Sequence, residues 1–358
     1  MKRDRSGPAD LVREEILALK AYHVAPASGM VKLDAMENPY RLPEPLREEV
    51  GRAVAALAVN RYPDPEAPEL KARLRESFAI PADAGLLIGN GSDEIIAILA
   101  QTLARPGAVM LAPEPSFAMY KMNALYTRMS YVGVPLERDF QLDAGRFLDA
   151  IATHRPALTF IAYPNNPTGN LFPEDAVARI VEASPGFVVL DEAYQVFARK
   201  SFMGRLAEFP NLMVMRTVSK LGLAGVRLGY AVAAPEWIRE FDKVRPPYNV
   251  SVLTQFVAER VLAHAGTLEQ QAARIRAERD ALFEALSDLR GVEAFPSDAN
   301  FILVRVADAD AVNARLKARK ILVRNFHGSH PLLANCLRLT VGTPGENELL
   351  LDALTASL

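Results

Sequence analysis

A lysine among small residues and glycines follows a strand-like run in the stretch Ser219-Lys-Leu-Gly-Leu-Ala-Gly-Val-Arg227. The preceding run over 212–215 is apolar, as is typical of a buried strand. Glycines let a backbone approach another group closely, and a lysine desolvated in such a turn has a more neutral, nucleophilic amine. Arg227 offers a planar donor fork that suits a phosphate. These residue types predict covalent lysine chemistry beside an anion, although the stretch taken alone also fits a solvated surface turn.

Polar side chains follow two other strand-like runs. Asp191 and Tyr194 come directly after the apolar run over 187–190, and Asn166 follows the run over 158–162. A strand that ends in Asp-Glu is also compatible with the Mg²⁺ site of a nucleotide hydrolase. Asparagines after a strand are also common turn residues. Taken singly, each of these positions therefore has a structural as well as a chemical interpretation.

The order of the elements brings these positions together. Strand-like runs alternate with helical stretches from about residue 86 to 235, which predicts an α/β fold with a mostly parallel sheet. Ligands of such sheets bind beyond the carboxyl ends of the strands. Asn166, Asp191 and Lys220 each lie just past such an end, so we expect them to converge on one crevice.

A glycine turn that opens a helix is a further candidate, in Gly89-Asn-Gly-Ser-Asp-Glu94. The backbone N–H groups at the start of a helix bind anions, and Ser92 or Asp93 is expected to be the N-cap. The third glycine of the dinucleotide fingerprint is missing, and no G-x-x-x-x-G-K-[ST] motif occurs in the chain. The nucleotide-hydrolase interpretation of Asp191 therefore loses most of its support, and the turn remains a candidate phosphate cradle.

The chain outside this region predicts a second, smaller lobe. Prolines at 39, 43 and 45 prevent a helix there, so the first residues are expected to form an extended arm. We expect an N-terminal arm that belongs to the small lobe over 1–45, a large domain with the candidate site over 46–250, and a small α+β domain over 251–358. Apolar periodicity predicts helices over 8–21, 45–59, 251–289 and 308–318, and a terminal helix whose capping box joins Thr343 to Glu346.

Three further side chains are candidates because of their position. In the last strand-like run, Arg338 and Thr340 share one face, where Arg338 is either a buried anion clamp or a solvated strand arginine. Tyr62 lies in a loop stiffened by prolines and can reach outward. Phe117 follows a strand, where it can stack on a flat ring or belong to the core.

An electrophilic cofactor that acts as an electron sink needs this set of groups. It needs a lysine for a Schiff base, a carboxylate for a ring nitrogen, a phenol and an amide for a ring hydroxyl, and a phosphate cradle. On these residues the sequence resembles the fold-type I pyridoxal-phosphate aminotransferases over nearly its whole length. The motifs that carry the resemblance are Asn-Asn-Pro-Thr-Gly169, Asp-Glu-Ala-Tyr194, Ser-Lys220 with Arg227, and Arg338.

The resemblance implies a pyridoxal 5'-phosphate site in the large domain. The cofactor-binding residues that it implies are Ser92, Asp93, Phe117, Asn166, Asp191, Tyr194, Ser219, Lys220 and Arg227, with Lys220, Asp191 and Tyr194 catalytic. It also implies a homodimer with shared active sites, in which Tyr62 reaches the cofactor phosphate of the partner subunit. The spacing between Lys220 and Arg227 is one residue shorter than in many relatives, and the glycines at 222 and 225 can absorb the difference.

Four stretches narrow the resemblance to the branch of the family that acts on histidinol phosphate. They are Asn-Arg-Tyr-Pro-Asp-Pro65, Gly-Asn-Gly-Ser-Asp-Glu94, Pro-Tyr-Asn-Val250 and Leu-Arg-Leu-Thr-Val-Gly342. This branch converts histidinol phosphate and 2-oxoglutarate to imidazole-acetol phosphate and glutamate in histidine biosynthesis. The substrate-binding residues that it implies are Tyr22, Asn38, Arg324 and Arg338, of which Tyr22, Arg324 and Arg338 hold the anionic end of the substrate. The alternatives are an aminotransferase for aromatic amino acids, a decarboxylase of phosphorylated amino acids with the same fold, and a non-catalytic protein that retains the fold.

Composition narrows the function classes. The 358 residues are 50% hydrophobic and 23% charged with a formal net charge of −2, which predicts a folded globular protein without a surface for nucleic acid or anionic membranes. The N-terminus has no apolar signal segment, and no run reaches transmembrane length. The single cysteine excludes an intramolecular disulfide, and the five histidines form no zinc-binding pattern. We therefore expect a cytoplasmic protein without a metal.

Overall fold

The computed structural model describes residues 7–21 and 26–358. Across these residues, seven strands form a sheet in the order β2-β8-β7-β6-β5-β3-β4. The strands are β2 (Gly85–Gly89), β3 (Val109–Glu114), β4 (Ser130–Pro135), β5 (Leu158–Ala162), β6 (Phe187–Asp191), β7 (Leu212–Thr217) and β8 (Gly229–Ala233). The two pairings of β8, with β2 and with β7, are antiparallel and the other four pairings of this sheet are parallel, so the predicted mostly parallel α/β fold is confirmed.

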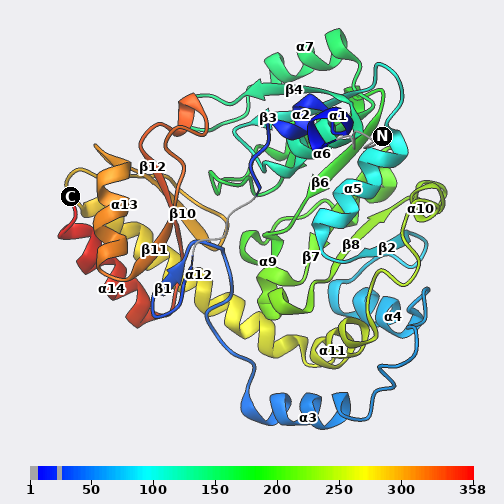
Figure 1. Ribbon diagram of the computed structural model, residues 1–358, viewed down its shortest axis with the longest axis horizontal. Helices are drawn as coiled ribbons and strands as arrows, with labels where there is room; N and C mark the ends of the chain where they lie inside the picture. Colours follow the sequence, from blue (N-terminus) through cyan, green and yellow to red (C-terminus); the bar gives the residue numbers. More distant parts are fainter. Residues whose placement is uncertain (1–6, 22–25) are drawn as a thin grey trace, which may run out of the picture.

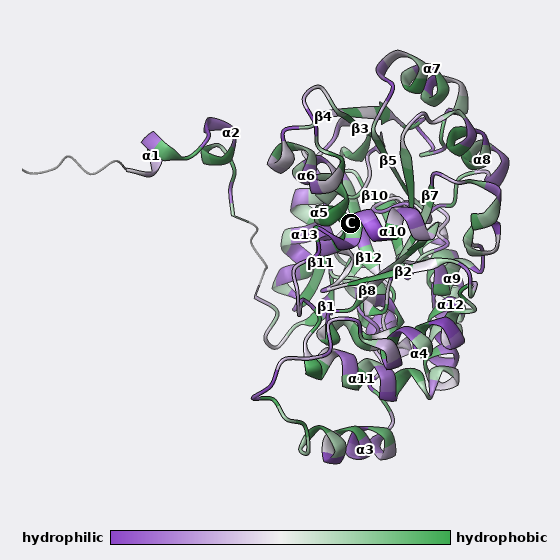
Figure 2. Ribbon diagram, turned by 90° about the vertical axis from the view of Figure 1, so that its right-hand side faces the viewer, coloured by the Kyte–Doolittle hydropathy of each residue, from purple (hydrophilic) through white to green (hydrophobic). Residues whose placement is uncertain are grey.

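Helices flank the large sheet, as alternation of strands and helices requires (Figure 1). They are α4 (Pro68–Phe78), α5 (Ser92–Leu103), α6 (Met119–Thr127), α7 (Ala144–His154), α8 (Glu174–Ala183), α9 (Gln195–Ala198) and α10 (Pro235–Asp242). Strands β5 and β6 are buried along their whole length, because helices pack on both faces of a parallel sheet. Figure 2 shows β5 coloured as hydrophobic in the interior of the large sheet. We call this sheet with its helices the large lobe.

A second sheet forms the small lobe, with five strands among the described residues in the order β1-β11-β12-β10-β9. Its elements are β1 (Val31–Leu33), β9 (Glu293–Ala294), β10 (Phe301–Arg305), α13 (Ala309–Ala318), β11 (Ile321–Asn325), β12 (Cys336–Thr340) and α14 (Pro344–Thr355). Strand β1 joins this sheet parallel to β11 although it lies far away in sequence (Figure 1). The predicted capping box of Thr343 and Glu346 is confirmed at the start of α14. The domain boundaries at 45 and 250 remain a prediction.

The predicted single helix over 251–289 is wrong, because two helices occupy this stretch. They are α11 (Val252–Leu262) and α12 (Ala265–Asp288), separated at His264, whose φ of −112° and ψ of 35° are not helical. Helix α11 packs against α4 and α3 (Glu44–Val54), whereas α12 reaches α9 and α14. The break therefore lets each helix turn its own apolar face toward a different set of neighbours.

Two other helix predictions are too long. The stretch 8–21 contains two short turns, α1 (Pro8–Leu11) and α2 (Glu14–Leu17), separated by extended backbone at Val12 and Arg13. The helix predicted over 45–59 is α3, which ends at Val54. Val59 is 67% exposed and Leu11 76% exposed, so these apolar side chains have no packing surface that would extend the helices.

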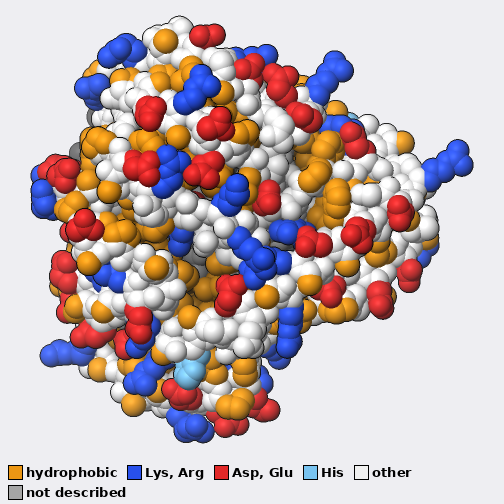
Figure 3. Space-filling view, turned by 180° about the vertical axis from the view of Figure 1, so that it is seen from behind, with side chains coloured by type: hydrophobic (Ala, Val, Ile, Leu, Met, Phe, Trp, Pro, Cys, Tyr) orange, Lys and Arg blue, Asp and Glu red, His pale blue; other side chains and the backbone are white. Residues whose placement is uncertain are grey.

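The surface mixes both signs of charge. Figure 3 shows acidic and basic side chains interspersed over the face that it presents. Within the described part of the chain, no helix is long and apolar enough to cross a membrane.

Candidate active site

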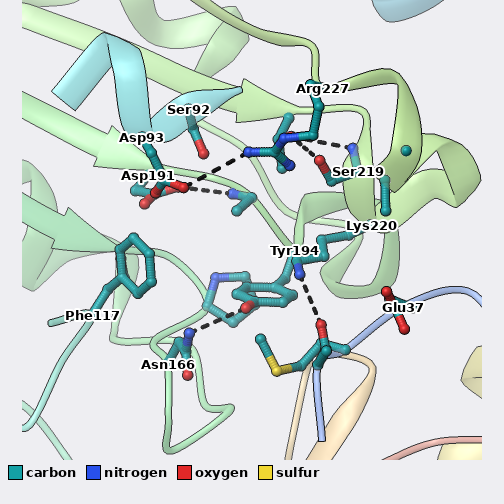
Figure 4. Close-up of a pocket in the computed structure, with 18 residues that line it drawn as sticks. Glu37, Ser92, Asp93, Phe117, Asn166, Asp191, Tyr194, Ser219, Lys220 and Arg227 are labelled. Carbon is teal, nitrogen blue, oxygen red and sulfur yellow. Dashed lines mark hydrogen bonds and ion pairs between the residues drawn. The ribbon is translucent and has the colours of Figure 1, made fainter. Parts of the chain in front are cut away.

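A pocket of about 350 Å³ lies at the carboxyl ends of β5, β6 and β7, below the start of α5 and beside the segment that follows β1. Parallel strands whose ends meet at one edge of a sheet commonly form ligand sites there. The residues predicted to bind a cofactor within one chain all line this pocket (Figure 4): Ser92, Asp93, Phe117, Asn166, Asp191, Tyr194, Ser219, Lys220 and Arg227. The structure therefore brings together the positions that the sequence analysis expected to converge.

Lys220 lies in a tight turn directly after β7. The turn, η2 (Ser219–Leu223), bends sharply at Gly222, whose φ of 131° suits glycine. The Lys220 Nζ donates to the Ala35 carbonyl at 3.2 Å and lies 5.9 Å from the centre of the Tyr194 ring. Burial, and after it the positive charge of Arg338, lower the pKa of Lys220 to about 8. Lys220 is thus an amine whose neutral, nucleophilic form is accessible near neutral pH.

Asp191 is the last residue of β6, and its carboxylate points into the pocket (Figure 4). It accepts hydrogen bonds from the Tyr120 hydroxyl at 2.7 Å and from the Ala193 amide at 3.1 Å. Burial raises the pKa of Asp191 to about 6, so the loss of water outweighs the two hydrogen bonds. A buried carboxylate of this kind is suited to a cationic partner inside the pocket.

Tyr120 is a functional residue that the sequence analysis missed. Its ring packs edge-on against Phe117 at 5.6 Å, and burial raises its pKa well above the usual range, which keeps the hydroxyl a donor to Asp191. The available signal was the closeness in sequence of Tyr120, in the first turn of α6, to the candidate Phe117. Neither the residue type of Tyr120 nor its spacing from Phe117 indicated a hydrogen bond to Asp191, which is far away in sequence.

Tyr194, Asn166 and Arg338 form a chain of side chains across the two lobes. The Asn166 amide donates to the Tyr194 hydroxyl at 3.2 Å, and Arg338 Nη1 donates to Asn166 Oδ1 at 2.6 Å. Burial raises the pKa of Tyr194, so its phenol stays protonated. Arg338 is 6% exposed, which matches the prediction of a buried arginine rather than a solvated one. The arginine reaches the pocket through Asn166.

The glycine turn before α5 forms a cradle in which a side chain at Gly91 or Gly229 would have no room. Gly91 has a φ of 79°, and a Cβ on it would lie 2.7 Å from Arg227 Nη2. A Cβ on Gly229 would lie 2.5 Å from the Ser92 nitrogen. The prediction that Ser92 or Asp93 caps α5 is wrong, because Gly91 is the N-cap and makes no side-chain bond. The backbone N–H groups at this end therefore remain directed toward the pocket side of the turn.

The cradle carries both signs of charge around these N–H groups. Arg227 Nη2 lies 3.9 Å from Asp93 Oδ2, and the two side chains are 50% and 49% exposed. The Ser219 amide donates to the Thr217 hydroxyl at 3.1 Å, which fixes Ser219 at the pocket wall. Such a set of donors beside a half-exposed arginine suits a phosphate.

Two further predicted residues, Tyr62 and Asn38, do not line the pocket. Tyr62 is 80% exposed and stacks on Tyr248 with the ring centres 4.5 Å apart. The Asn38 amide donates to the Leu221 carbonyl at 3.1 Å and to Gln271 at 2.9 Å, so it ties the Lys220 turn to α12. Tyr22 lies outside the described residues.

Arg324 and Arg338 are cross-strand partners in β11 and β12. Their guanidinium carbons lie 5.9 Å and 5.2 Å from the centre of the Phe326 ring. The side chains of a directly opposed pair project from the same face of a sheet. Two cationic groups thus approach one another on the face that carries Arg338 toward Asn166.

The fold and this site define the class of protein: residues 28–354 match the family described as aminotransferase class I and II, and the chain belongs to that family. Its sequence is 58% identical over 344 residues to a histidinol-phosphate aminotransferase of Chromobacterium violaceum, which covers 96% of this chain and 97% of that protein. It is 55% identical over 353 residues to histidinol-phosphate aminotransferase 1 of Ralstonia nicotianae, which covers 97% of this chain and 94% of that protein. Among solved structures, the histidinol-phosphate aminotransferase from Sinorhizobium meliloti in complex with pyridoxal-5'-phosphate superimposes with a TM-score of 0.86 and 26% identity, over 96% of each chain.

The residues of the pocket fit pyridoxal phosphate. Asp191 is a buried carboxylate that meets only neutral donors in the described chain, and a protonated ring nitrogen would supply the missing positive charge. The cradle of Gly91, Ser92 and Arg227 suits the phosphate, and Phe117 faces the pocket at the place where a flat ring would lie (Figure 4). Lys220 offers the amine that bonds an aldehyde.

Proposed function

We propose that this chain transfers the amino group of L-histidinol phosphate to 2-oxoglutarate, with pyridoxal phosphate bound covalently to Lys220. The products would be imidazole-acetol phosphate and L-glutamate, in histidine biosynthesis. The observation that carries the choice of substrate is the opposed pair of Arg324 and Arg338 beside a complete cofactor pocket. The names of relatives at 58% and 55% identity, which span nearly the whole chain, support the same substrate.

Each residue of the pocket has a separate role toward the cofactor. When bound, pyridoxal phosphate withdraws electrons from the donor carbon that bears the amine. Asp191 holds the ring nitrogen in its protonated form, and Tyr120 holds Asp191 in place. Tyr194 and Asn166 provide hydrogen bonds for the ring hydroxyl, and the turn from Gly91 to Asp93 with Arg227 binds the phosphate.

Lys220 moves the proton of the reaction. When the donor occupies the site, the Lys220 amine would be available to act as a general base. A pKa of about 8 leaves part of the amine neutral at pH 7 and nearly all of it neutral above pH 9, so it can accept the proton from the donor carbon. Lys220 would also be the group that delivers this proton again within the site, before water releases the keto product.

Two arginines fit a phosphate dianion better than they fit one carboxylate. A phosphate presents several acceptor oxygens to planar guanidinium groups, whereas a carboxylate is saturated by one bidentate arginine. An aminotransferase for aromatic amino acids would need Arg338 alone, and Arg324 would then be a solvated strand residue. The two interpretations therefore differ in the role of Arg324, which either binds the phosphate or is solvated.

Replacing Arg324 by alanine separates these two substrates. A charged hydrogen bond lost at such a site costs roughly 1.5–3 kcal/mol, so Arg324→Ala should lower kcat/KM for histidinol phosphate by about tenfold to a hundredfold. The value for phenylalanine should change much less, because phenylalanine has no phosphate. Arg319→Ala removes an exposed arginine at the end of α13 and serves as the matched control. An equal loss for both donors would show that Arg324 does not bind the phosphate.

We also propose that the protein is cytoplasmic and that it forms a homodimer whose subunits share their active sites. Tyr62 lies on an exposed loop and stacks on Tyr248, so its hydroxyl is available to a neighbouring subunit. In this arrangement the phenol would reach the phosphate of the partner's cofactor, as the resemblance to the family implies.

A further inference from the structure

Three successive backbone carbonyls after β1 accept hydrogen bonds from side chains at or beside the pocket. We call this segment, Asp34–Met36, the strap. The donors to the carbonyls of Asp34, Ala35 and Met36 are, in order, Arg338 Nη2 at 2.9 Å, Lys220 Nζ at 3.2 Å and Asn300 Nδ2 at 3.0 Å. The strap thus contacts both the arginine that faces the anion and the lysine that carries the chemistry.

Met36 gives the strap its shape. Its φ of 53° lies in the left-handed region, which a residue other than glycine, asparagine or aspartate occupies only where its surroundings fix it. The Met36 amide donates to Thr340 Oγ1 at 3.1 Å, and the Met36 carbonyl accepts from Asn300. Hydrogen bonds therefore hold the backbone on both sides of the Met36 Cα. The conformation turns the Met36 side chain into the pocket and the Ala35 carbonyl toward Lys220.

The two residues that hold Met36 come from rigid elements of the small lobe. Thr340 is the last residue of β12 and pairs with Phe301, the first residue of β10, directly after Asn300. Thr340 is 3% exposed and Asn300 0% exposed, so neither can move without disturbing the sheet. Thr340 also shares a strand face with Arg338, two residues earlier. One face of β12 therefore serves both the anion and the strap.

We propose that the strap positions Lys220 for proton transfer, with Met36, Thr340 and Asn300 as positioning residues. This rests on the proposed function in one respect, that Lys220 is the base. In the step, the bond between the donor carbon and its hydrogen breaks, the proton goes to Nζ, and the electron pair stays with the donor and its cofactor. The ammonium so formed donates to the Ala35 carbonyl, which accepts more strongly from an ammonium than from an amine.

The first test uses the cofactor-free protein and needs no donor. Acetic anhydride acylates neutral amines, so the pH dependence of labelling at the Lys220 peptide, read by mass spectrometry, reports the pKa of that amine. In Thr340→Val the strap loses the acceptor for its Met36 amide, so the Ala35 carbonyl should no longer face Nζ. Because the ammonium form of Lys220 then loses an acceptor, the labelling curve should move to lower pH. Thr159→Val is the matched control, because the Thr159 hydroxyl in β5 is buried without a hydrogen-bond partner among the described residues. Its curve should coincide with that of the wild type.

The second test separates the conformation of Met36 from its side chain. Met36→Gly keeps a left-handed conformation accessible, whereas Met36→Val disfavours it because valine is branched at Cβ. With a donor deuterated at the amine-bearing carbon, Met36→Val should lower kcat by about tenfold and increase the deuterium isotope effect, since proton transfer becomes slower than the other steps. Met36→Gly should lose much less of the rate. Thermal unfolding of each variant shows whether it is folded.

The outcomes distinguish this proposal from the proposed function. An unchanged labelling curve for folded Thr340→Val, or an equal loss in Met36→Gly and Met36→Val, would show that the strap does not position Lys220. A wild-type protein that rejects histidinol phosphate would overturn the substrate but not the strap. The labelling curve of Lys220 does not depend on any donor.

Discussion

Burial disfavours the charged form of Asp191, which is the form that its proposed role at the ring nitrogen requires. Its pKa of about 6, raised from 3.8 chiefly by burial, means that the folded protein binds more protons than the unfolded chain between about pH 4 and pH 6. The stability of the cofactor-free protein therefore falls as the pH rises through this window. The cost is present at neutral pH, where the carboxylate is charged and its hydrogen-bond partners among residues 7–21 and 26–358 are the neutral donors of Tyr120 and Ala193.

Replacing Asp191 by asparagine should stabilise the cofactor-free protein above pH 6. A rise in pKa from 3.8 to about 6 corresponds to at most about 3 kcal/mol. The amide keeps one oxygen for Tyr120 or Ala193 and loses the other, so we expect a net gain of about 1–2 kcal/mol that disappears below pH 4. Denaturant titrations at pH 4, 6 and 8 measure it, with exposed Asp149→Asn as the control. A cofactor-free Asp191→Asn protein that is less stable than the wild type at pH 8 would contradict this account of the carboxylate.

At the residue scale, the sequence indicates the groups that act on the cofactor but not the groups that hold them. Lys220, Asp191, Tyr194 and Asn166 are recognisable because each follows a strand-like run in a motif. Tyr120 is not recognisable, because its bond to Asp191 joins residues 71 positions apart. Such contacts depend on how α6 packs on the sheet, which local pattern does not determine.

At the scale of elements, the approach of β8 to the start of α5 shapes the phosphate cradle. Gly229 in β8 lies so close to the turn that a Cβ would be 2.5 Å from the Ser92 nitrogen and 2.6 Å from the Gly91 carbonyl carbon. Both atoms belong to the backbone and cannot rotate away. The absence of a side chain at Gly229 is therefore required for the cradle to close.

Gly229→Ala should weaken the binding of pyridoxal phosphate and lower the melting temperature. Overpacking of this kind costs roughly 1–3 kcal/mol, which corresponds to a five- to hundredfold loss of affinity if it falls on the cradle. Gly204→Ala, outside the pocket, is the matched control, since a Cβ there meets nothing within 4 Å. Fluorescence titration of the cofactor-free proteins with pyridoxal phosphate measures both. Equal affinities in the two variants would show that the close approach does not shape the cradle.

The type of each strand and helix was predictable at this scale, whereas helix ends were not. The runs over 187–190 and 212–215 became β6 and β7 because continuous apolar runs are typical of strands buried on both faces. The stretch 251–289 is amphipathic throughout, and only its packing against α3 and α4 on one side and α9 and α14 on the other explains the break at His264. Local periodicity cannot show a change of packing partner.

At the scale of the whole molecule, the active site depends on both lobes. Strand β12 of the small lobe carries Arg338 to Asn166 at the end of β5 in the large lobe, and the strap after β1 reaches Lys220 after β7. Two segments of the small lobe, which Arg338 and Asp34 join across 304 residues of sequence, thus reach the pocket at the edge of the large sheet. A change in the relative position of the lobes would alter the anion site and the lysine together.

The proposed sharing of active sites between subunits predicts complementation. Lys220→Ala and Tyr62→Ala chains, inactive alone, should regain about a quarter of wild-type activity when they are unfolded and refolded together in equal amounts. Half of the dimers would then be hybrids with one intact site each. Mixing Lys220→Ala with Asp191→Asn is the control, because both changes affect residues that line one pocket of a single chain. Hybrid dimers without activity would place the action of Tyr62 within its own subunit or rule it out.

The most direct test of the central claim is a comparison of amino donors with the purified wild-type enzyme. Histidinol phosphate, phenylalanine and phosphothreonine are each supplied with 2-oxoglutarate and added pyridoxal phosphate, and glutamate, keto product and CO₂ are followed together. The pairing of Arg324 with Arg338 predicts the highest kcat/KM for histidinol phosphate, with glutamate formed in step with its keto product and no CO₂. A higher kcat/KM for phenylalanine, or release of CO₂ from phosphothreonine as the main reaction, would contradict the account.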